Sequence, residues 1–246
     1  MSTPFLSLII PAHDEATRLA ETLIQVFEFI AKQPYTTEVL VVENGSQDNT
    51  FQLAQDFAAK NPQLRVLRNP QSGKGRAVQQ GMLAAQGEYR FMCDVDFSMP
   101  IDEINRFLPP ALEGYDIAIA SREAPGAVRY GEPFYRHIVG RIYNRLIRTL
   151  ALPDLQDTQC GFKCFKGAVA EDLFPRQTLP GWSFDVEILF IARLLLYNVI
   201  EIPIPWYYNR HSKIKVMGDS LKMGKDILTI RMNARRGVYI PSNVRI

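Results

Sequence analysis

The segment YRFMCDVD, residues 89–96, decides how this chain folds. Its first five residues have the length and composition of a buried strand, and two acidic residues, Asp94 and Asp96, follow at once. Ligands of parallel sheets bind outside the carboxyl ends of the strands. The segment therefore places two carboxylates where they can address one cation and the phosphates that it bridges. Because aspartate is common in loops, a solvated turn is the alternative interpretation.

Strand and helix patterns alternate on both sides of this segment, separated by short turns. We expect strands at 5–10, 39–42, 65–67, 89–93 and 115–120, and helices at 19–30, from Ser46, at 75–85 and at 101–112. This alternation predicts an α/β fold with a doubly wound, mostly parallel sheet and flanking helices.

The second half of the chain is less regular. We expect an amphipathic helix at 133–150, helices at 184–197 and 219–236, and an edge strand at 200–206. The first of these helices has an expected apolar stripe of Val139, Ile142, Tyr143, Leu146 and Leu150. Its arginines, Arg141, Arg145 and Arg148, fall on a different face. No repeat or linker divides the chain, so one domain spanning 1–246 is predicted.

Composition and charge narrow the class of protein. The 246 residues are 47% hydrophobic and 22% charged, which is ample for a core and excludes disorder and collagen-like repeats. A net charge of +2 argues against a nucleic-acid binder. Residues 206–246, however, contain nine Lys/Arg and two Asp/Glu, so the remaining 205 residues carry −5. A basic C-terminal helix favours an anionic partner or membrane surface, with a solvated helix face as the alternative.

Cysteine usage and hydropathy predict a reduced chain without membrane spans. Cys93, Cys160 and Cys164 form neither a disulfide framework nor a zinc motif. The first residues lack the basic region of a signal peptide. The longest apolar stretch, 188–200, is interrupted by Arg193 and is too short to cross a bilayer.

Two further motifs follow the first two expected strands, and a third precedes a helix. The segments PAHDE (11–15) and ENGS (43–46) should converge on one rim, where they can bind a base and ribose; helix capping by Asp14 and Ser46 is the alternative. The segment GKGR (73–76) combines a glycine turn, a helix start and two cations, which favours phosphate. It is neither a Walker A motif nor G-x-G-x-x-G, so an ordinary turn is its alternative.

Seven segments carry a family resemblance: SLIIPAHDEA, VVENGSQDNT, SGKGRAVQQGMLAAQGEY, FMCDVDFSMP, DTQCGFKCF, WSFDVEIL and DSLKMGKDILTIR. Together they resemble family 2 glycosyltransferases of the GT-A fold, over nearly the whole chain and in the expected order. Within that family the resemblance is nearest to dolichyl-phosphate β-glucosyltransferases and related polyprenyl-phosphate glycosyltransferases. It implies a nucleotide-sugar half at about 1–121 and an acceptor half at about 122–246.

The resemblance implies roles on the donor side. The implied nucleotide-sugar-binding residues are Pro11, Ala12, Glu15, Glu43, Lys74, Asp94, Val95 and Asp96. Asp94 and Asp96, with Ser98 nearby, are implied to hold Mg²⁺ or Mn²⁺. The chain departs from the family in having Glu43-Asn44 where Asp-Asp is usual, and His13-Asp14 where Tyr-Asn is commoner. The first departure concerns the nucleobase preference rather than the phosphate chemistry.

On the acceptor side the resemblance implies that Arg122 and Arg136 bind the acceptor phosphate, with Lys163 as a further contact. Asp157 matches an acidic residue credited with a catalytic role, so the implied catalytic set is Asp96, Arg122, Arg136 and Asp157. Asp185 and Glu187 match a segment near the acceptor. The alternatives are surface salt bridges for the two arginines and helix capping for Asp185 and Glu187.

The implied reaction is an inverting, metal-dependent transfer of a hexose, best glucose from UDP-glucose, to a polyprenyl (dolichyl) phosphate. The product would be a lipid-linked sugar donor for glycosylation, including protein N-glycosylation. The enzyme would work peripherally on the cytoplasmic face of a membrane and bind no nucleic acid. Other sugars (mannose, N-acetylglucosamine, glucuronate) and a non-lipid glycan acceptor remain open. So do a sugar-1-phosphate nucleotidylyltransferase, which would need a glycine-rich first loop, and a non-catalytic scaffold.

Overall fold

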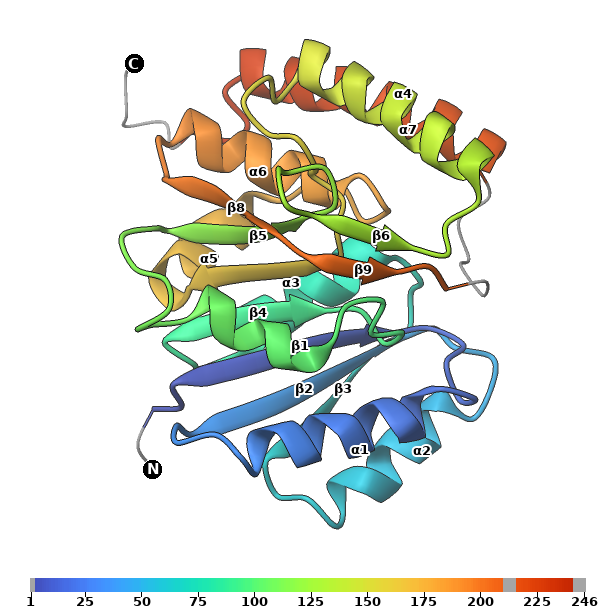
Figure 1. The fold of residues 1–246 in the computed structure, drawn as a ribbon, viewed down its shortest axis with the longest axis vertical. Coiled ribbons are helices and arrows are strands. Elements are labelled where there is room, and N and C mark those ends of the chain that lie inside the picture. The colour runs from blue at the N-terminus through green and yellow to red at the C-terminus, as the bar shows by residue number, and fades with distance from the viewer. Residues whose placement is uncertain (1–2, 210–215, 241–246) are drawn as a thin grey trace.

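A computed structural model describes residues 3–209 and 216–240. Its centre is a seven-stranded sheet in the order β3-β2-β1-β4-β7-β5-β8 (Figure 1). The strands are β1 (Leu6–Ala12), β2 (Thr37–Asn44), β3 (Leu64–Asn69), β4 (Tyr89–Cys93), β5 (Ile117–Ser121), β7 (Phe162–Lys166) and β8 (Val199–Pro203). The expected α/β sheet is thereby confirmed.

One strand breaks the parallel arrangement. β1, β2, β3 and β4 run parallel, and β5 pairs in parallel with β8, but β7 is antiparallel to both β4 and β5. β7 therefore starts at the edge where β4 and β5 end. This brings the loop 153–161, which precedes β7, beside the acids that follow β4.

Helices cover both faces of the sheet. α1 (Leu19–Ile30), α2 (Thr50–Ala58) and the 3₁₀ helix η1 (Ile101–Phe107) contribute to the core on one face. α3 (Lys74–Ala84), α5 (Gly167–Leu173), η2 (Phe174–Arg176) and α6 (Phe184–Leu194) pack on the other. α4 (Phe134–Leu150) and α7 (Val216–Arg235) lie together at one end of the molecule, with α7 also against α6 (Figure 1). The apolar faces of all these helices are removed from water where they pack, and this burial drives the layered arrangement.

A second, two-stranded sheet lies beside the end of β5. It pairs β6 (Val128–Tyr130) with β9 (Pro205–Tyr207) in parallel, and the rings of Tyr130 and Tyr207 stack at 4.7 Å. The single edge strand expected at 200–206 is thus two strands. β8 is the edge of the main sheet, as predicted, whereas β9 begins at Pro205 and pairs with β6 instead.

Several local expectations were wrong. The helix expected from Ser46 begins at Thr50, because the Asp48 carboxylate accepts the Thr50 backbone N–H and holds the first turn. The helix expected at 101–112 ends at Phe107, before two consecutive prolines. On α4, Ile142 and Leu146 are exposed rather than packed, whereas Ile147, outside the expected stripe, is buried. β6 and α5 were not expected.

Two expectations about burial held. Cys93, Cys160 and Cys164 are buried free thiols, and Leu189 and Ile191 of α6 belong to the core. Within the described ranges, no helix combines the length and the apolar character that a membrane crossing requires.

The close seating of α3 on the sheet depends on Gly81. A Cβ built there would lie 2.4 Å from Cγ2 of Ile9 and 3.0 Å from Cγ2 of Val42. We expect Gly81→Ala to lower the free energy of unfolding by about 1–3 kcal/mol, because both strand residues are fully buried and must shift. Urea denaturation measures the change. Gly224→Ala, where a Cβ meets open space within α7, is the matched control and should be neutral or stabilising. Equal losses would contradict this account of the packing.

Candidate active site

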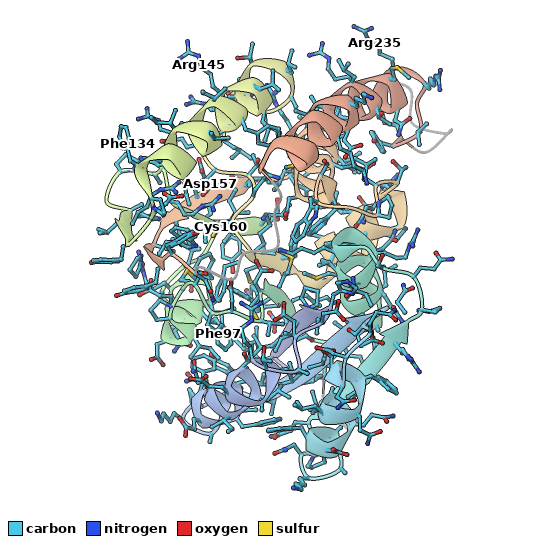
Figure 2. The ribbon with its side chains drawn as sticks, turned by 90° about the vertical axis from the view of Figure 1, so that its right-hand side faces the viewer. Phe97, Phe134, Arg145, Asp157, Cys160 and Arg235 are labelled. Atoms are coloured by element: carbon cyan, nitrogen blue, oxygen red, sulfur yellow. The ribbon has the colours of Figure 1, made fainter. Side chains whose placement is uncertain are left out.

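A cavity of about 270 Å³ opens at the carboxyl ends of β4 and β5, beside the start of β7. One part of its wall is polar and charged: Lys74, Asp94, Asp96, Ser98, Arg122 and Asp185. Another part is mainly apolar: Met99, Val139, Tyr143, Phe162, Trp206 and Met223. α4 and α7 each contribute to the apolar part. Asp157 and Cys160 lie beneath α4 (Figure 2).

Asp94, Asp96 and Lys74 form the charged centre of the cavity. Nζ of Lys74 lies 2.6 Å from Oδ1 of Asp94. Burial alone would lower the pKa of Lys74, but Asp94, Asp185 and Asp96 together raise it above its ordinary value. Burial and the neighbouring charge of Asp94 raise the pKa of Asp96, although the Ser98 backbone N–H donates to its carboxylate. Lys74 is therefore a fixed cation, and Asp96 lacks a full counter-charge.

A tight glycine turn places Lys74 at the start of α3. Gly73 has φ +144°, and a Cβ there would lie 2.6 Å from the carbonyl oxygen of Pro180. Gly75 is equally confined, since its Cβ would lie 2.7 Å from the Leu179 carbonyl oxygen. Only glycine fits both positions. The loop that confines the turn also carries Trp182, whose ring centroid lies 5.5 Å from Nζ of Lys74.

Gly161 allows Asp94 to reach its position. A Cβ built on Gly161 would lie 1.8 Å from Oδ2 of Asp94. This glycine belongs to the segment DTQCGFKCF that leads into β7, so the antiparallel strand brings it against the acids after β4. The sequence alone did not point to Gly161 as a site residue, although it lies in one of the seven segments that carry the family resemblance.

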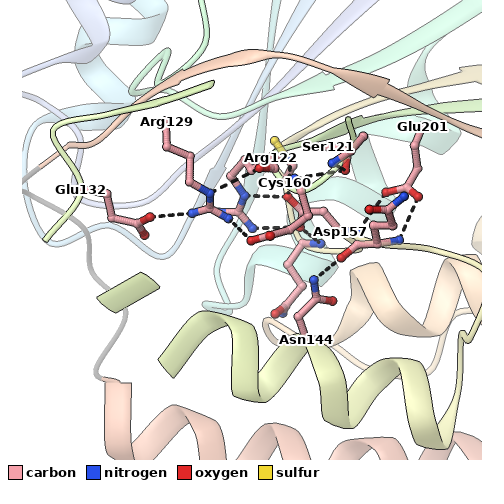
Figure 3. Close-up of polar contacts among 12 residues, drawn as sticks. Ser121, Arg122, Arg129, Glu132, Asn144, Asp157, Cys160 and Glu201 are labelled. Carbon is pink, nitrogen blue, oxygen red and sulfur yellow. Dashed lines mark hydrogen bonds and ion pairs between the residues drawn. The ribbon is translucent and has the colours of Figure 1, made fainter. Parts of the chain in front are cut away.

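Arg122 and Asp157 form a bidentate pair (Figure 3). Nε and Nη2 of Arg122 donate to the two carboxylate oxygens of Asp157 at 2.7 and 2.9 Å, and the Arg122 backbone N–H donates at 2.9 Å. Burial would raise the pKa of Asp157, but Arg122 holds it at about 2. Glu201 in β8 accepts the backbone N–H groups of Gln156 and Asp157 and fixes the loop. Asp157 therefore orients Arg122 and is a weak base.

The other side of Arg122 faces Trp206. Its Cζ lies 5.5 Å from the Trp206 ring centroid, and that of Arg129 lies at 5.6 Å. Arg129 in turn bridges Glu123 and Glu132, at 2.5 and 2.7 Å. These contacts hold the Arg122 guanidinium in one orientation on the cavity wall. Arg136 has its backbone in α4, but its side chain lies outside the described part of the structure.

The WSFDVEIL segment supplies one residue to the cavity and one to its frame. Asp185 lines the cavity and pairs with the buried Lys163, whose Nζ lies 2.6 Å from Oδ1 of Asp185. Lys163 also donates to the carbonyl oxygen of Cys160. Burial raises the pKa of Asp185 despite the opposing charges of Lys163 and Lys74. The Lys163 ammonium group is thus paired with groups of the protein, and Lys163 does not line the cavity.

Glu187 lies outside the cavity and is fully buried. Its carboxylate accepts the backbone N–H groups of Thr178 and Leu179, at 3.0 and 2.7 Å, and the hydroxyl of Tyr239 at 2.8 Å. It therefore holds the loop that confines the glycine turn and presents Trp182.

The residues expected to bind nucleotide gather at one edge of the sheet. Ala12 at the end of β1 lies in register with Glu43 at the end of β2. Glu43 accepts the Ser46 backbone N–H and lies 3.3 Å from Nε of Arg68. The Glu15 carboxylate pairs with Arg18, and the carbonyl oxygen of Val95 accepts the Thr22 hydroxyl. Pro11 directly precedes Ala12 in β1. Pro11, Ala12, Glu15 and Glu43 are not part of the cavity wall described above.

The fold and the charged rim agree with comparisons with known proteins. Residues 7–174 match the family described as "Glycosyl transferase family 2". The chain belongs to this family and is a glycosyltransferase. It is 32% identical to a dolichyl-phosphate beta-glucosyltransferase of Trichomonas vaginalis, over 97% of this chain and 74% of that protein. It is 30% identical to the dolichyl-phosphate beta-glucosyltransferase of Saccharomyces cerevisiae, over 96% and 76%.

Solved structures confirm the GT-A fold. Mannosyl-3-phosphoglycerate synthase from Rubrobacter xylanophilus has a TM-score of 0.65 at 15% identity, covering 99% of this chain and 77% of that one. Glucosyl-3-phosphoglycerate synthase from Mycobacterium tuberculosis, solved with Mn²⁺, UDP-glucose and phosphoglyceric acid, has a TM-score of 0.62 at 17% identity, covering 98% and 81%.

The close approach of Gly161 to Asp94 gives a prediction for catalysis. We expect Gly161→Ala to lower kcat/KM for the sugar donor roughly 10- to 100-fold, because the added methyl displaces the Asp94 carboxylate. Steady-state kinetics measures this, and thermal unfolding shows whether the fold survives. Gly181→Ala, where the added Cβ meets open space, should retain activity. Unchanged kinetics in Gly161→Ala would mean that Asp94 need not occupy this position.

The Arg122–Asp157 pair gives a pH-dependent prediction for stability. The pKa of Asp157 falls from 3.8 to about 2 on folding, so its charged form contributes roughly 2 kcal/mol above pH 3.8, lost as the pH falls through about 2. Asp157→Asn should therefore be least stable relative to wild type near neutral pH. Urea denaturation from about pH 6 to pH 3 measures the difference, which should narrow at the acidic end. Asp154→Asn, which removes an exposed pair in the same loop, should change little. A gap for Asp157→Asn that is independent of pH would contradict the assignment.

Proposed function

We propose that this glycosyltransferase transfers glucose from UDP-glucose to a polyprenyl phosphate of the dolichyl type, with inversion at the anomeric carbon. The observation that carries the proposal is one cavity that joins two carboxylates and a lysine to an apolar wall from α4 and α7. A nucleotide sugar needs the first part, and a phosphate on an isoprenoid chain fits the second. The names of the similar Trichomonas and yeast proteins support this choice of sugar and acceptor.

The donor set suits a divalent cation such as Mg²⁺ or Mn²⁺. Asp94 and Asp96 repel each other in a buried setting, as the raised pKa of Asp96 reflects. No cluster of three or more His, Cys, Asp or Glu suited to a metal occurs in the described ranges. Asp94 and Asp96, with Ser98 adjacent, are the residues that would hold such a cation, because carboxylate oxygens are the ligands that hard divalent ions prefer. When bound, the ion would neutralise charge on the leaving diphosphate.

The chain's own cation acts on the same leaving group. Lys74 stays protonated at neutral pH, because the surrounding carboxylates raise its pKa. It is positioned by the glycine turn at the start of α3, where backbone N–H groups also favour phosphate. Lys74 thus stabilises negative charge that develops as the glycosidic bond to the diphosphate breaks.

The acceptor requires orientation more than deprotonation. A phosphate monoester has its second pKa near 6, so the nucleophilic oxygen is already largely ionised at neutral pH. The low pKa of Asp157 agrees with this, since a carboxylate with a pKa of about 2 removes protons poorly. Arg122, held by Asp157 and Trp206, aligns the acceptor phosphate for in-line attack, and Arg136 is proposed as a second contact.

The membrane encounter is proposed to be peripheral, on the cytoplasmic face, and the product to serve as a lipid-linked donor for glycosylation. The apolar wall formed by Val139, Tyr143 and Met223 supports contact with the chain of a lipid acceptor. The acidic rim at Asp94 and Asp96 instead serves the donor. This division follows the proposed donor and acceptor halves of the chain.

A donor panel tests the proposal. We expect UDP-glucose with Mg²⁺ or Mn²⁺ and a polyprenyl phosphate to give a β-linked product faster than the GDP-mannose or UDP-N-acetylglucosamine reactions. Asp96→Ala should lose at least about 100-fold of this rate, because it removes a carboxylate proposed to hold the cation that offsets charge on the leaving diphosphate. Radiolabel transfer and anomeric NMR measure rate and configuration. An α-linked product, or equal rates with Asp96→Ala, would contradict the proposal; exposed Asp154→Ala is the control and should keep the rate.

A further inference from the structure

One polar side chain lies on the buried face of α1. The buried residues of this helix are Leu19, Thr22, Leu23, Val26, Phe29 and Ile30. Thr22 is the polar member of this set and is 4% exposed. A hydroxyl buried among apolar side chains lowers stability unless it finds a hydrogen-bond partner inside the protein. The partner of Thr22 therefore indicates what the threonine does.

The Thr22 hydroxyl donates to the turn that carries the two acids. Oγ1 of Thr22 lies 2.6 Å from the carbonyl oxygen of Val95, and 3.1 Å from that of Arg18, one helical turn earlier. A hydroxyl has one proton to donate, and the shorter contact identifies Val95 as the main acceptor. Helical threonines usually bond to their own preceding turn. This threonine instead bonds across 73 positions of sequence to another segment.

Val95 is the residue between Asp94 and Asp96. Its side chain is 5% exposed and belongs to the same apolar cluster as Leu23 of α1. Both acidic neighbours line the cavity instead. The backbone between the two acids is therefore held on its core side twice, by the packing of the Val95 side chain and by the hydrogen bond from Thr22.

The turn that follows Val95 is strained. Phe97 has φ +36°, in the left-handed region that residues with a side chain rarely adopt. Within the turn, the backbone N–H of Phe97 lies 3.4 Å from the carbonyl oxygen of Asp94, and that of Ser98 donates to the Asp96 carboxylate at 3.2 Å. Both hydrogen bonds are long. A strained turn with long bonds of its own needs support from a neighbouring element, and α1 supplies it.

α1 can give this support because its start is itself fixed. The Glu15 backbone N–H donates to the Thr50 hydroxyl at 2.7 Å. The backbone N–H of Ala16 donates to the Asp48 carboxylate at 3.0 Å. The loop after β2, the start of α1 and the turn of the two acids are thus connected in series.

We propose that Thr22 is a positioning residue for Asp94 and Asp96, and that its hydrogen bond to Val95 holds the two carboxylates where they can share one divalent cation. This role rests on the proposed function for its cation. Thr22 is not part of the cavity wall, so it acts through the backbone that joins the acids. Loss of the hydroxyl would leave the buried Val95 carbonyl oxygen without its donor and free the turn to adopt other conformations.

Hydrogen exchange followed by mass spectrometry tests the positioning without any ligand. Thr22→Val keeps the shape of the side chain and removes the hydroxyl, so a peptide covering residues 94–98 should exchange roughly tenfold faster than in wild type. Thr22→Ser keeps the hydroxyl and should exchange as wild type does. Ser7→Ala is the matched control, because it breaks the buried bond from Ser7 to Glu38, 2.6 Å long, at the amino-terminal end of β1. It should lower Tm and leave exchange at 94–98 unchanged.

A titration of Mn²⁺ in the presence of UDP tests the consequence for the cation. Electron paramagnetic resonance of the free ion measures its affinity for the protein. Thr22→Val should bind Mn²⁺ about tenfold more weakly, because residues that orient metal ligands typically contribute 10- to 100-fold to metal affinity. Thr22→Ser and Ser7→Ala should match wild type. A second series with GDP makes the result independent of the proposed base.

An unchanged value for Thr22→Val in either measurement would overturn the proposal, as would a wild type that binds Mn²⁺ with neither nucleotide. Circular dichroism checks folding, and Thr22→Ala gives the same comparison if the valine variant is unfolded. If wild type transfers glucose and Thr22→Val binds Mn²⁺ normally, the positioning role fails and the proposed function stands. If wild type transfers glucose to no polyprenyl phosphate, yet Thr22→Val exchanges faster and loses Mn²⁺ affinity that Thr22→Ser retains, the proposed function fails and the positioning role stands.

Discussion

The carboxylates of Asp94 and Asp96, two residues apart on the wall of one small cavity, are the constraint around which this structure is arranged. Asp94 and Asp96 directly follow a fully buried strand, which fixes the position of their backbone at the edge of the sheet. Lys74 approaches Asp94 from α3, and Gly161 approaches it from the start of β7. Three segments far apart in sequence therefore meet at one carboxylate. In the proposed reaction, these carboxylates would hold the sugar donor through a divalent cation.

The other buried charged side chains near Asp94 and Asp96 either line the cavity or hold the surrounding backbone in place. Lys163 pairs with Asp185 and with a backbone carbonyl, and Glu187 accepts two backbone N–H groups and a tyrosine hydroxyl. Breaking either arrangement would leave a charge without compensation in a dry interior. These residues therefore keep the glycine turn and the loop that confines it in place. Arg122 has both properties: Asp157 holds its guanidinium in place, and Arg122 lines the cavity.

The alternation of strands and helices was predictable from the sequence because most strands are rich in apolar residues, although β3 (LRVLRN) and β7 (FKCFK) also contain charged ones. The order of the sheet beyond β4 was not, since an antiparallel β7 depends on pairing between distant segments. For the same reason, the contact of Gly161 with Asp94 has no local signal. The positions of Asp94, Asp96 and Lys74 could be expected from strand ends and a glycine turn. The commitment of Lys163 to Asp185 could not, because burial depends on the whole fold.

The pattern of apolar residues in α4 shows a further limit of prediction from the sequence. Hydrophobicity alone assigned Ile142 and Leu146 to the packed side, although the helix has apolar residues almost all around. A helix with apolar residues almost all around leaves the choice of its packed side to the tertiary fold, which here buries Ile147. The basic excess in residues 206–246 falls partly on α7, which contacts α4 and exposes Lys222, Lys225 and Arg235. The near-neutral net charge therefore averages a basic C-terminal segment and a remainder of the chain that carries −5.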